Sequence, residues 1–541
     1  MYFIFFMLFL TGITSSTNSS TDIVVPTRNG AIIGTSTTYN GSPLHEFFGV
    51  PYAQPPTGDL RFRKTQPLTS QPNILFAKTM PPACPQYLPY DYPWYDNKPN
   101  KSEDCLYLNI WAPGFATQEK KAVLFWLHGG GYTYGSNRLE VYNGHILAAE
   151  NDVVVVSPNF RNGVFGFLST DSDLAPGNMG LYDILEALKW VKNNIEYFGG
   201  DSMKISLFGQ STGAVTAGLF CISPLAKNLF QRAILGSRTP VEYSYDHKKS
   251  NFDLGQRLAE VVGCANNRTT LQNDTVLVVE CLKRVNADYL AKALNSLSPS
   301  NSKHFNIIYG DELLPITPET ALIDENINDV SVFLGFNQDE GSPNLVSSDI
   351  NYFGPFGERN PYFNKTVGSN FIQDGLKEFV GVRDVVEHYL GHLSENDYQQ
   401  VREQTYHALG DYIKACPVIY FGDGLLRAGK DVYFYYFNHR PTVTQYADWM
   451  GVYHFCQVPF VFGQPLNSKK GYTQEEMELS RYMMTLWTNF AKYGQPSVNT
   501  EKSTPQTRNY IYLRTSNWKS SYLKNHEENC EFYKNYFDQQ E

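Results

Sequence analysis

Residues 206–220 read SLFGQSTGAVTAGLF, an apolar run in which Gly209 and Gly213 flank Ser211 at a spacing of two residues. The run follows a β-rich segment and continues into a second apolar stretch, which predicts a strand, a tight turn and a buried helix. Glycine on both sides of the serine permits a turn too tight for larger side chains, and the turn exposes the serine hydroxyl. The stretch therefore predicts an α/β fold with a nucleophilic serine at the end of a strand.

Other short β-rich segments alternate with helical patterns along the chain. They read AVLFWLHGGG (122–131), DVVVVSPNF (152–160), QRAILGS (231–237), VSVFLGFN (330–337) and DVYFYYFNHR (431–440). Residues 184–195 carry apolar side chains at helical spacing. Alternating strands and helices predict a large, mostly parallel central sheet flanked by helices. The less regular segment 345–430 is expected to form a helical insertion over this sheet.

The N-terminal twenty residues, MYFIFFMLFLTGITSSTNSS, change from apolar to small and polar. The apolar part is shorter than the roughly 20 residues that span a bilayer, so it predicts a cleaved signal peptide over residues 1–19. An uncleaved anchor or a buried strand is the alternative.

Residues 20–541 are expected to form one α/β domain, secreted to the extracellular space, and no later segment is apolar enough to span a membrane. Five glycosylation sequons agree with secretion, at Asn40, Asn100, Asn267, Asn273 and Asn364.

The net charge of the chain limits the classes of molecule that it is expected to bind. A formal net charge of −10 argues against a nucleic-acid ligand, which requires a basic face. A small-molecule substrate is expected instead, and the sequence does not exclude a homo-oligomer.

Eight cysteines in a secreted chain indicate disulfides. Cys84 with Cys105, and Cys264 with Cys281, would close short loops, and Cys416 with Cys530 would tie down the C-terminal segment. Cys221 and Cys456 are left over, and the pairing is not determined by the sequence. The chain has no CxxC motif or Cys/His cluster, so no metal site is predicted.

A nucleophilic serine needs a base and donors for the developing oxyanion. The segment His128–Gly131 follows a predicted strand, and its backbone N–H groups, with that of Thr212, are candidates for the oxyanion hole. Among eleven histidines, His454 lies in a loop-like stretch after the last strong strand and follows the acid in the expected chain order. Asp339 and Glu340 are both candidates for the acid.

Motifs along nearly the whole mature length resemble the type-B carboxylesterase/lipase family of α/β hydrolases. They include VPYAQPPTGDLRF, SEDCLYLNIWAP, HGGGY, NFRNGVFGFL, GNMGLYD, FGGD, NQDEGS and GVYH, besides the serine turn itself. The resemblance implies Glu340 as the acid of a Ser211–His454–Glu340 triad. It also implies Gly130, Gly131 and Thr212 as oxyanion donors, the three disulfides above, and an ester hydrolase that needs no cofactor.

Several segments, such as GDYIKACPV and WMGVYHF, look most like cholinesterases. Trp94 falls one residue from the choline-stacking tryptophan of those enzymes, and Tyr142 matches a tyrosine of the same pocket. Cholinesterases carry glutamate where this chain has Gln210 and Gln457, which removes negative charge from the expected substrate pocket.

Further departures concern the residues beside the triad. Pro343 and Asn344 replace aromatic residues, and Arg238 enters the neighbourhood. The resemblance therefore predicts a serine carboxylesterase with weakened preference for cations. An acetylcholinesterase and, less favoured because the triad is intact, a non-catalytic adhesion protein are the alternatives.

Overall fold

The computed structural model describes the chain in the following ranges: 21–28, 30–69, 73–88, 95, 100–115, 119–241, 247–297, 304–377, 379–467, 469–515 and 522–537. The predicted signal peptide 1–19 and Trp94 lie outside the described residues.

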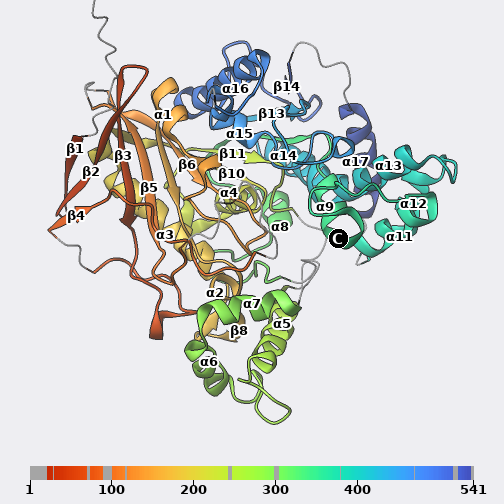
Figure 1. Ribbon diagram of the computed structural model, residues 1–541, viewed down its shortest axis with the longest axis horizontal. Coiled ribbons are helices and arrows are strands. Elements are labelled where there is room, and N and C mark those ends of the chain that lie inside the picture. The colour runs from red at the N-terminus through yellow and green to blue at the C-terminus, as the bar shows by residue number, and fades with distance from the viewer. Residues whose placement is uncertain are drawn as a thin grey trace, which may run out of the picture.

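A single large sheet runs through the described part of the molecule (Figure 1). Its strands lie in the spatial order β1-β2-β3-β5-β7-β6-β10-β11-β12-β13-β14, with β4 paired to β2. Their bounds are β1 Thr21–Thr27, β2 Gly30–Tyr39, β3 Ser42–Pro51, β4 Ile74–Phe76, β5 Tyr107–Pro113, β6 Lys121–Leu127, β7 Val154–Pro158, β10 Gly200–Gln210, β11 Arg232–Gly236, β12 Ser331–Asn337, β13 Val432–Phe437 and β14 Tyr510–Leu513. A separate short hairpin consists of β8 Ser169–Ser172 and β9 Ala175–Pro176.

In this spatial order, neighbouring strands from β7 through β6 and β10 to β14 pair in parallel. Neighbouring strands from β1 through β2, β3 and β5 to β7 pair antiparallel. In the parallel part, Gly209 of β10 pairs with Leu127 of β6 and with Leu235 of β11. Strands β6, β10, β11 and β12 therefore end at the same edge of the sheet. In open α/β sheets this edge is where ligands bind. The mostly parallel α/β sheet predicted from the sequence is confirmed.

Helices cover both faces of the sheet (Figure 1). Their bounds are α1 His145–Asn151, α2 Gly163–Phe167, α3 Met179–Asn194, α4 Thr212–Ile222, α5 His247–Val261, α6 Thr275–Arg284, α7 Ala287–Leu297, α8 Pro318–Ile323, α9 Ser342–Ser348, α10 Ile350–Phe353, α11 Lys365–Gly375, α12 Val382–Leu390, α13 Tyr398–Gly410, α14 Cys416–Arg427, α15 Val458–Val461, α16 Gln474–Tyr493 and α17 Leu523–Phe537.

Strand β6 shows why both faces need cover. Val123 and Phe125 belong to the same buried cluster as α3 and α4, while Leu124 and Trp126 belong to the cluster that contains α16. Because successive side chains of a strand point to opposite faces, an apolar run such as β6 is stable only between two helical layers.

The segment 345–430 is helical, as predicted, but only part of it lies beside the sheet as an insertion. Helices α11, α12 and α13 pack on one another at one side of the sheet (right in Figure 1). Helix α14 packs against β12 and β13 and is the crossover between these two parallel strands. A π-helical turn, Asp411–Ala415, joins α13 to α14.

The three expected disulfides are present: Cys84–Cys105, Cys264–Cys281 and Cys416–Cys530. Cys221 and Cys456 are buried and unpaired. Among the sequons, Asn40, Asn100, Asn267 and Asn273 are exposed, and Asn364 is the N-cap of α11, so glycosylation stays a prediction. Within the described ranges, no helix is long and apolar enough to cross a bilayer.

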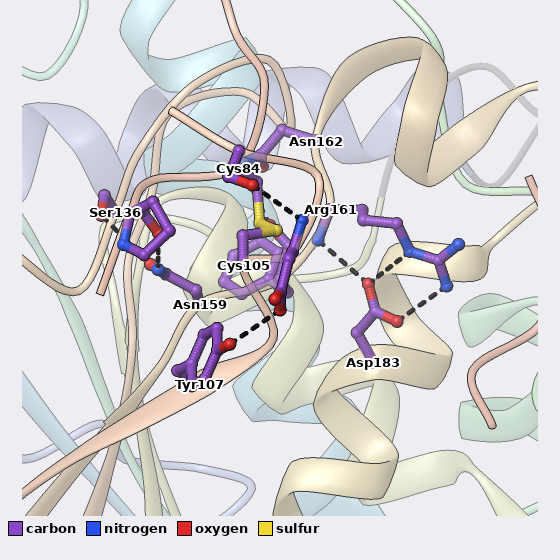
Figure 2. The surroundings of a disulfide bond; sticks show 12 residues. Cys84, Cys105, Tyr107, Ser136, Asn159, Arg161, Asn162 and Asp183 are labelled. Carbon is purple, nitrogen blue, oxygen red and sulfur yellow. Dashed lines mark hydrogen bonds and ion pairs between the residues drawn. A yellow bond between two sulfur atoms is a disulfide. The ribbon is translucent and has the colours of Figure 1, made fainter. Parts of the chain in front are cut away.

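A buried polar network holds the loops beside the first disulfide (Figure 2). The Arg161 guanidinium, 2% exposed, donates to both carboxylate oxygens of Asp183 on α3, at 2.8 and 2.7 Å. Asn159 donates to Pro82 O at 2.9 Å and accepts from Ser136 Oγ at 3.1 Å. The loop after β7 is thereby tied both to the disulfide loop and to the loop after β6.

We expect Arg161→Met to lower the free energy of unfolding by about 3–5 kcal/mol, because the Asp183 carboxylate would stay buried without its counter-ion, keeping only the Thr65 hydroxyl and one backbone N–H as donors. Urea unfolding followed by tryptophan fluorescence measures the loss. The control is Lys249→Met, which removes an exposed ion pair with Asp253 (2.6 Å) and should change stability by less than about 0.5 kcal/mol. Equal losses in the two variants would contradict this role of Arg161.

Candidate active site

Ser211 occupies the turn between β10 and α4 with φ 55° and ψ −126°. A positive φ is strained for a residue with a Cβ, and such strain persists only where the surroundings enforce it. The Ser211 N–H donates to Gly236 O at 2.9 Å. A Cβ on Gly213 would lie 2.0 Å from Leu127 O, and one on Gly209 would lie 2.2 Å from the backbone of Gly213. Both glycines are therefore required for the close packing that produces this turn, as predicted from the sequence.

Glu340 and His454 meet beside this turn. The Nδ1 atom of His454 lies 2.5 Å from Glu340 Oε2. The other carboxylate oxygen, Oε1, accepts from the backbone N–H of Asn337 at 2.7 Å. Burial raises the pKa of Glu340, but the charge and hydrogen bond of His454, together with the Lys414 charge and a Ser237 hydrogen bond, outweigh burial and lower the pKa below its ordinary value. Glu340 is held as a carboxylate, and His454 carries its proton on Nδ1.

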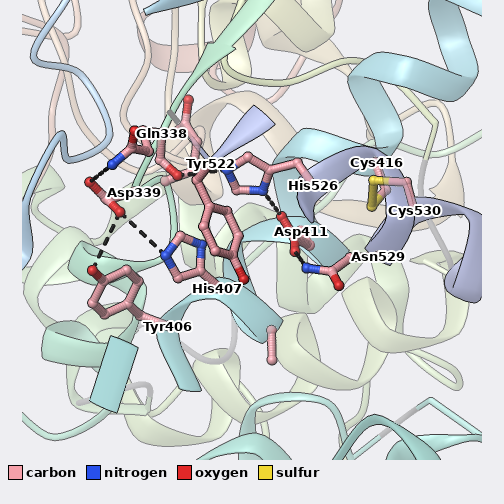
Figure 3. A network of polar contacts seen from close by, with 12 residues as sticks. Gln338, Asp339, Tyr406, His407, Asp411, Cys416, Tyr522, His526, Asn529 and Cys530 are labelled. Carbon is pink, nitrogen blue, oxygen red and sulfur yellow. Dashed lines mark hydrogen bonds and ion pairs between the residues drawn. A yellow bond between two sulfur atoms is a disulfide. The ribbon is translucent and has the colours of Figure 1, made fainter. Parts of the chain in front are cut away.

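Asp339 contacts a separate set of residues, which Figure 3 shows. Its Oδ2 accepts from the Val452 N–H at 2.7 Å, and its Oδ1 lies 3.3 Å from the Tyr406 hydroxyl and 3.4 Å from His407 Nε2. Burial raises the pKa of Asp339 to about 6. Residue spacing left Asp339 and Glu340 as equal candidates. The geometry places only Glu340 on the imidazole.

A second buried group lies beyond Asp339 in Figure 3. The His526 ring contacts Asp411 through Nδ1 and donates through Nε2 to Gln338 O at 2.9 Å. Asp411 also accepts from Tyr389 and Asn529, both at 2.7 Å. The Cys416–Cys530 disulfide joins the same two segments, so the C-terminal helix α17 supports the loop that carries Glu340.

Gln210 lies against the free nitrogen of the histidine. Its Nε2 is 3.1 Å from His454 Nε2, and with Nδ1 protonated the ring nitrogen is the acceptor. In the described part of the chain, no hydrogen bond joins Ser211 Oγ to His454. The Gln210 amide therefore donates to the His454 nitrogen that would accept a proton from Ser211. This hydrogen bond must break before that proton can be transferred.

Two positively charged side chains, Lys414 and Arg238, also act on His454. Burial lowers the pKa of His454, and the charges of Lys414 and Arg238 lower it further against the pull of Glu340. Lys414 donates to Glu340 O at 3.2 Å. A base with a lowered pKa is neutral, and able to accept a proton, at pH values below the ordinary histidine range.

A cavity of about 260 Å³ opens onto these residues. Gly130, Gly131, Ser211 and His454 line it, as do Tyr142 and Gln210 from the predicted substrate pocket. No carboxylate is present among the described residues that line this cavity. Thr212, the third predicted oxyanion donor, is buried at the first position of α4, directly after Ser211.

Gln457 does not line the cavity, contrary to the prediction that it belongs to the substrate pocket. Its side chain is buried, donates to Ser237 Oγ at 2.9 Å and accepts from Asn337 Nδ2 at 2.7 Å. The helical turn after His454 directs it beneath the Glu340 loop instead of toward the substrate. Trp94 lies outside the described residues, so its predicted place in the pocket stays a prediction.

Sequence reasoning missed Asn337, Ser237 and Lys414. The first two lie at strand ends next to residues that were identified, and Ser237 has φ 64°. Lys414 stands alone in an otherwise apolar helix pattern, IKACPVIYF, and that isolated charge was the available signal.

Comparison with known proteins agrees with this geometry. The model of the carboxylesterase family matches residues 21–540. The chain belongs to the carboxylesterase family. It is a carboxylic ester hydrolase of the cholinesterase-like kind, and it resembles three proteins named for that activity.

Acetylcholinesterase-1 of Trittame loki is 38% identical, over 87% of this chain and 86% of the relative. Acetylcholinesterase of Danio rerio is 35% identical, over 90% and 83%. Cholinesterase of Mus musculus is 32% identical, over 99% and 90%.

We expect Glu340→Gln to lower kcat by about 10⁴-fold, because an amide cannot stabilise the imidazolium that forms on His454. Asp339→Asn should cost far less, since Asp339 does not touch the histidine. Steady-state hydrolysis of a simple ester measures both. A larger loss in the Asp339 variant than in the Glu340 variant would overturn the assignment.

Proposed function

We propose that this carboxylesterase is a secreted serine hydrolase in which Ser211 is the nucleophile, His454 the general base and Glu340 its partner. The observation that carries the proposal is the contact of buried Glu340 with partly buried His454, 2.5 Å long, at the cavity into which the strained Ser211 turn opens. Lowering of the His454 pKa keeps the base neutral for its role.

The reaction is acyl transfer in two halves. His454 takes the Ser211 proton as Oγ bonds to the ester carbonyl carbon, and the tetrahedral oxyanion is held by the N–H groups of Gly130, Gly131 and Thr212. The C–O bond to the alcohol then breaks, and the alcohol leaves with the proton from His454. Water repeats the sequence on the acyl-enzyme and releases the acid. No cofactor takes part in these steps.

The cavity supports a substrate other than a choline ester. Binding of a quaternary ammonium depends on aromatic faces and on nearby negative charge. Gln210 is neutral, Gln457 is turned away, and the described cavity wall has no carboxylate. Choline ester hydrolysis, the activity in the names of the relatives, is the second candidate, favoured by the aromatic wall that includes Tyr142.

Ser211→Ala should lower kcat by about 10⁵–10⁶-fold while leaving the fold intact, since only the oxyanion hole and binding remain. A fluorophosphonate probe followed by mass spectrometry should label Ser211 in the unmodified protein and no residue in the variant. Labelling at another residue, or unchanged hydrolysis by the variant, would refute the nucleophile. An unlabelled protein without hydrolysis would favour an adhesion role.

Gln210→Glu should raise the rate of acetylthiocholine hydrolysis relative to its neutral isostere 3,3-dimethylbutyl thioacetate by up to about tenfold. At an effective dielectric of about 20, a charge roughly 6 Å away contributes about 3 kcal/mol before desolvation, and 1.4 kcal/mol is one decade. Gln506→Glu adds the same charge at an exposed site and serves as control. An unchanged ratio, or a strong preference for choline in the unmodified enzyme, would show that the charge of residue 210 does not set selectivity.

A further inference from the structure

Lys414 is a buried cation in the wall of the catalytic cavity. It lies in the π-helical turn Asp411–Ala415, where it faces the cavity together with Ile413, and the residue is 4% exposed. π-Helical turns often occur at functional sites because they displace side chains from the regular helical order. Here Asp411 of the turn contacts His526, and Lys414 lines the cavity. Burial of an ammonium is costly unless a negative charge compensates it.

The protein partners of the Lys414 ammonium are neutral oxygens. Nζ donates to the backbone oxygen of Glu340 at 3.2 Å and to the side-chain oxygen of Asn344. The two oxygens of the Glu340 carboxylate bind the Asn337 N–H and His454 Nδ1 instead. Across the described ranges, no carboxylate lies within ion-pair distance of Lys414, and its third N–H has no protein acceptor.

Arg238 places a second positive charge on the same cavity. It follows the C-terminal end of β11, two residues beyond the carbonyl that accepts from the Ser211 N–H. Burial lowers the pKa of Lys414 to about 8, and the Arg238 charge contributes in the same direction against the pull of Glu340. Lys414 is therefore still largely protonated at neutral pH, and both cations face the space beside His454.

We propose that Lys414, with Arg238 beside it, binds a carboxylate of the substrate, so that the enzyme prefers small esters that carry a negative charge. The proposal rests on the function proposed above and names its substrate class. A cavity of about 260 Å³ accommodates a half-ester of a short dicarboxylic acid or an acyl ester of a hydroxy acid. These two arrangements share the carboxylate and differ in which side of the ester bond carries it.

A bound carboxylate also assists the chemistry. Lys414 and Arg238 disfavour the imidazolium that His454 must form in the transition state. A substrate anion placed against both cations offsets their field and raises the basicity of the histidine. The preference should therefore appear in kcat/KM and should not be limited to KM.

The test compares two charged esters with their neutral isosteres. Monoethyl glutarate carries the charge on the acyl side and is paired with its terminal amide, while butyryloxyacetate carries it on the alcohol side and is paired with butyryloxyacetamide. We expect the unmodified enzyme to favour the anion in at least one pair by about tenfold in kcat/KM. The pair that shows this preference identifies the side on which the carboxylate binds.

Lys414→Gln keeps a donor for Glu340 O and removes the charge. It should reduce the anion-to-amide ratio by about tenfold, equivalent to about 1.4 kcal/mol of transition-state interaction. Lys414→Arg should retain most of the preference. Lys365→Gln is the matched control, because this partly buried lysine also donates to two neutral oxygens, Gly391 O and Leu393 O, but does not line the cavity.

A ratio near one for both pairs in the unmodified enzyme, or a ratio that Lys414→Gln leaves unchanged, would overturn the proposal. If either result is found while the ester bonds of the neutral isosteres are hydrolysed and Ser211 is labelled, the serine hydrolase function stands and only the anion site fails. A measurement that needs no variant is binding of glutarate and glutaramide to the unmodified protein by calorimetry. Tighter binding of glutarate supports the site, and equal or weaker binding contradicts it.

Discussion

The approach of α4 to β6 at the serine turn is the constraint on which the site depends. Gly213 lies against the backbone of Leu127 so closely that no Cβ fits between them. This contact forces Ser211 into a positive φ and turns its side chain out of the sheet at the edge where β6, β10, β11 and β12 all end. The proposed oxyanion donors, base and acid have a common location only because these strand ends are adjacent.

Three more positions near this edge carry similar strain. Ser237 and Phe455 have φ of 64° and 88°, and Tyr132 has φ of 55°. Each is held by its surroundings: the Ser237 hydroxyl accepts from Gln457, Tyr132 packs against Phe167 with ring centroids 4.8 Å apart, and Phe455 contacts Tyr142 with ring centroids 6.1 Å apart. Strain at a catalytic edge is stored in the backbone and stabilised by packing elsewhere. The large two-sided core supplies that packing.

The charges around His454 balance two needs. Burial, Lys414 and Arg238 lower the pKa of His454, whereas Glu340 raises it; in the proposed mechanism the first effect keeps the free histidine neutral and the second favours the imidazolium. Asp339 would disturb this balance if it faced the ring, but it is engaged by Val452, Tyr406 and His407 in a separate compartment. Two adjacent acids therefore have different partners, because the chain after β12 directs their side chains to different segments.

The sequence by itself determined the sheet, the serine turn and the stretch that carries His454, because these depend on local patterns. Flanking glycines and alternating apolar runs act over short stretches of chain, whereas the Cys416–Cys530 disulfide joins segments 114 residues apart. The choice between Asp339 and Glu340 was different, since neighbouring residues share the same local pattern and only contacts with 406–407 and 452–454 separate them. The tertiary structure alone also decided that Gln457 lies beneath the Glu340 loop, that Gln210 contacts His454, and that a π-helical turn 411–415 brings Lys414 to the cavity. Each of these depends on the direction of a side chain relative to a segment far away in the sequence, and the pattern of residues along the chain does not encode that direction.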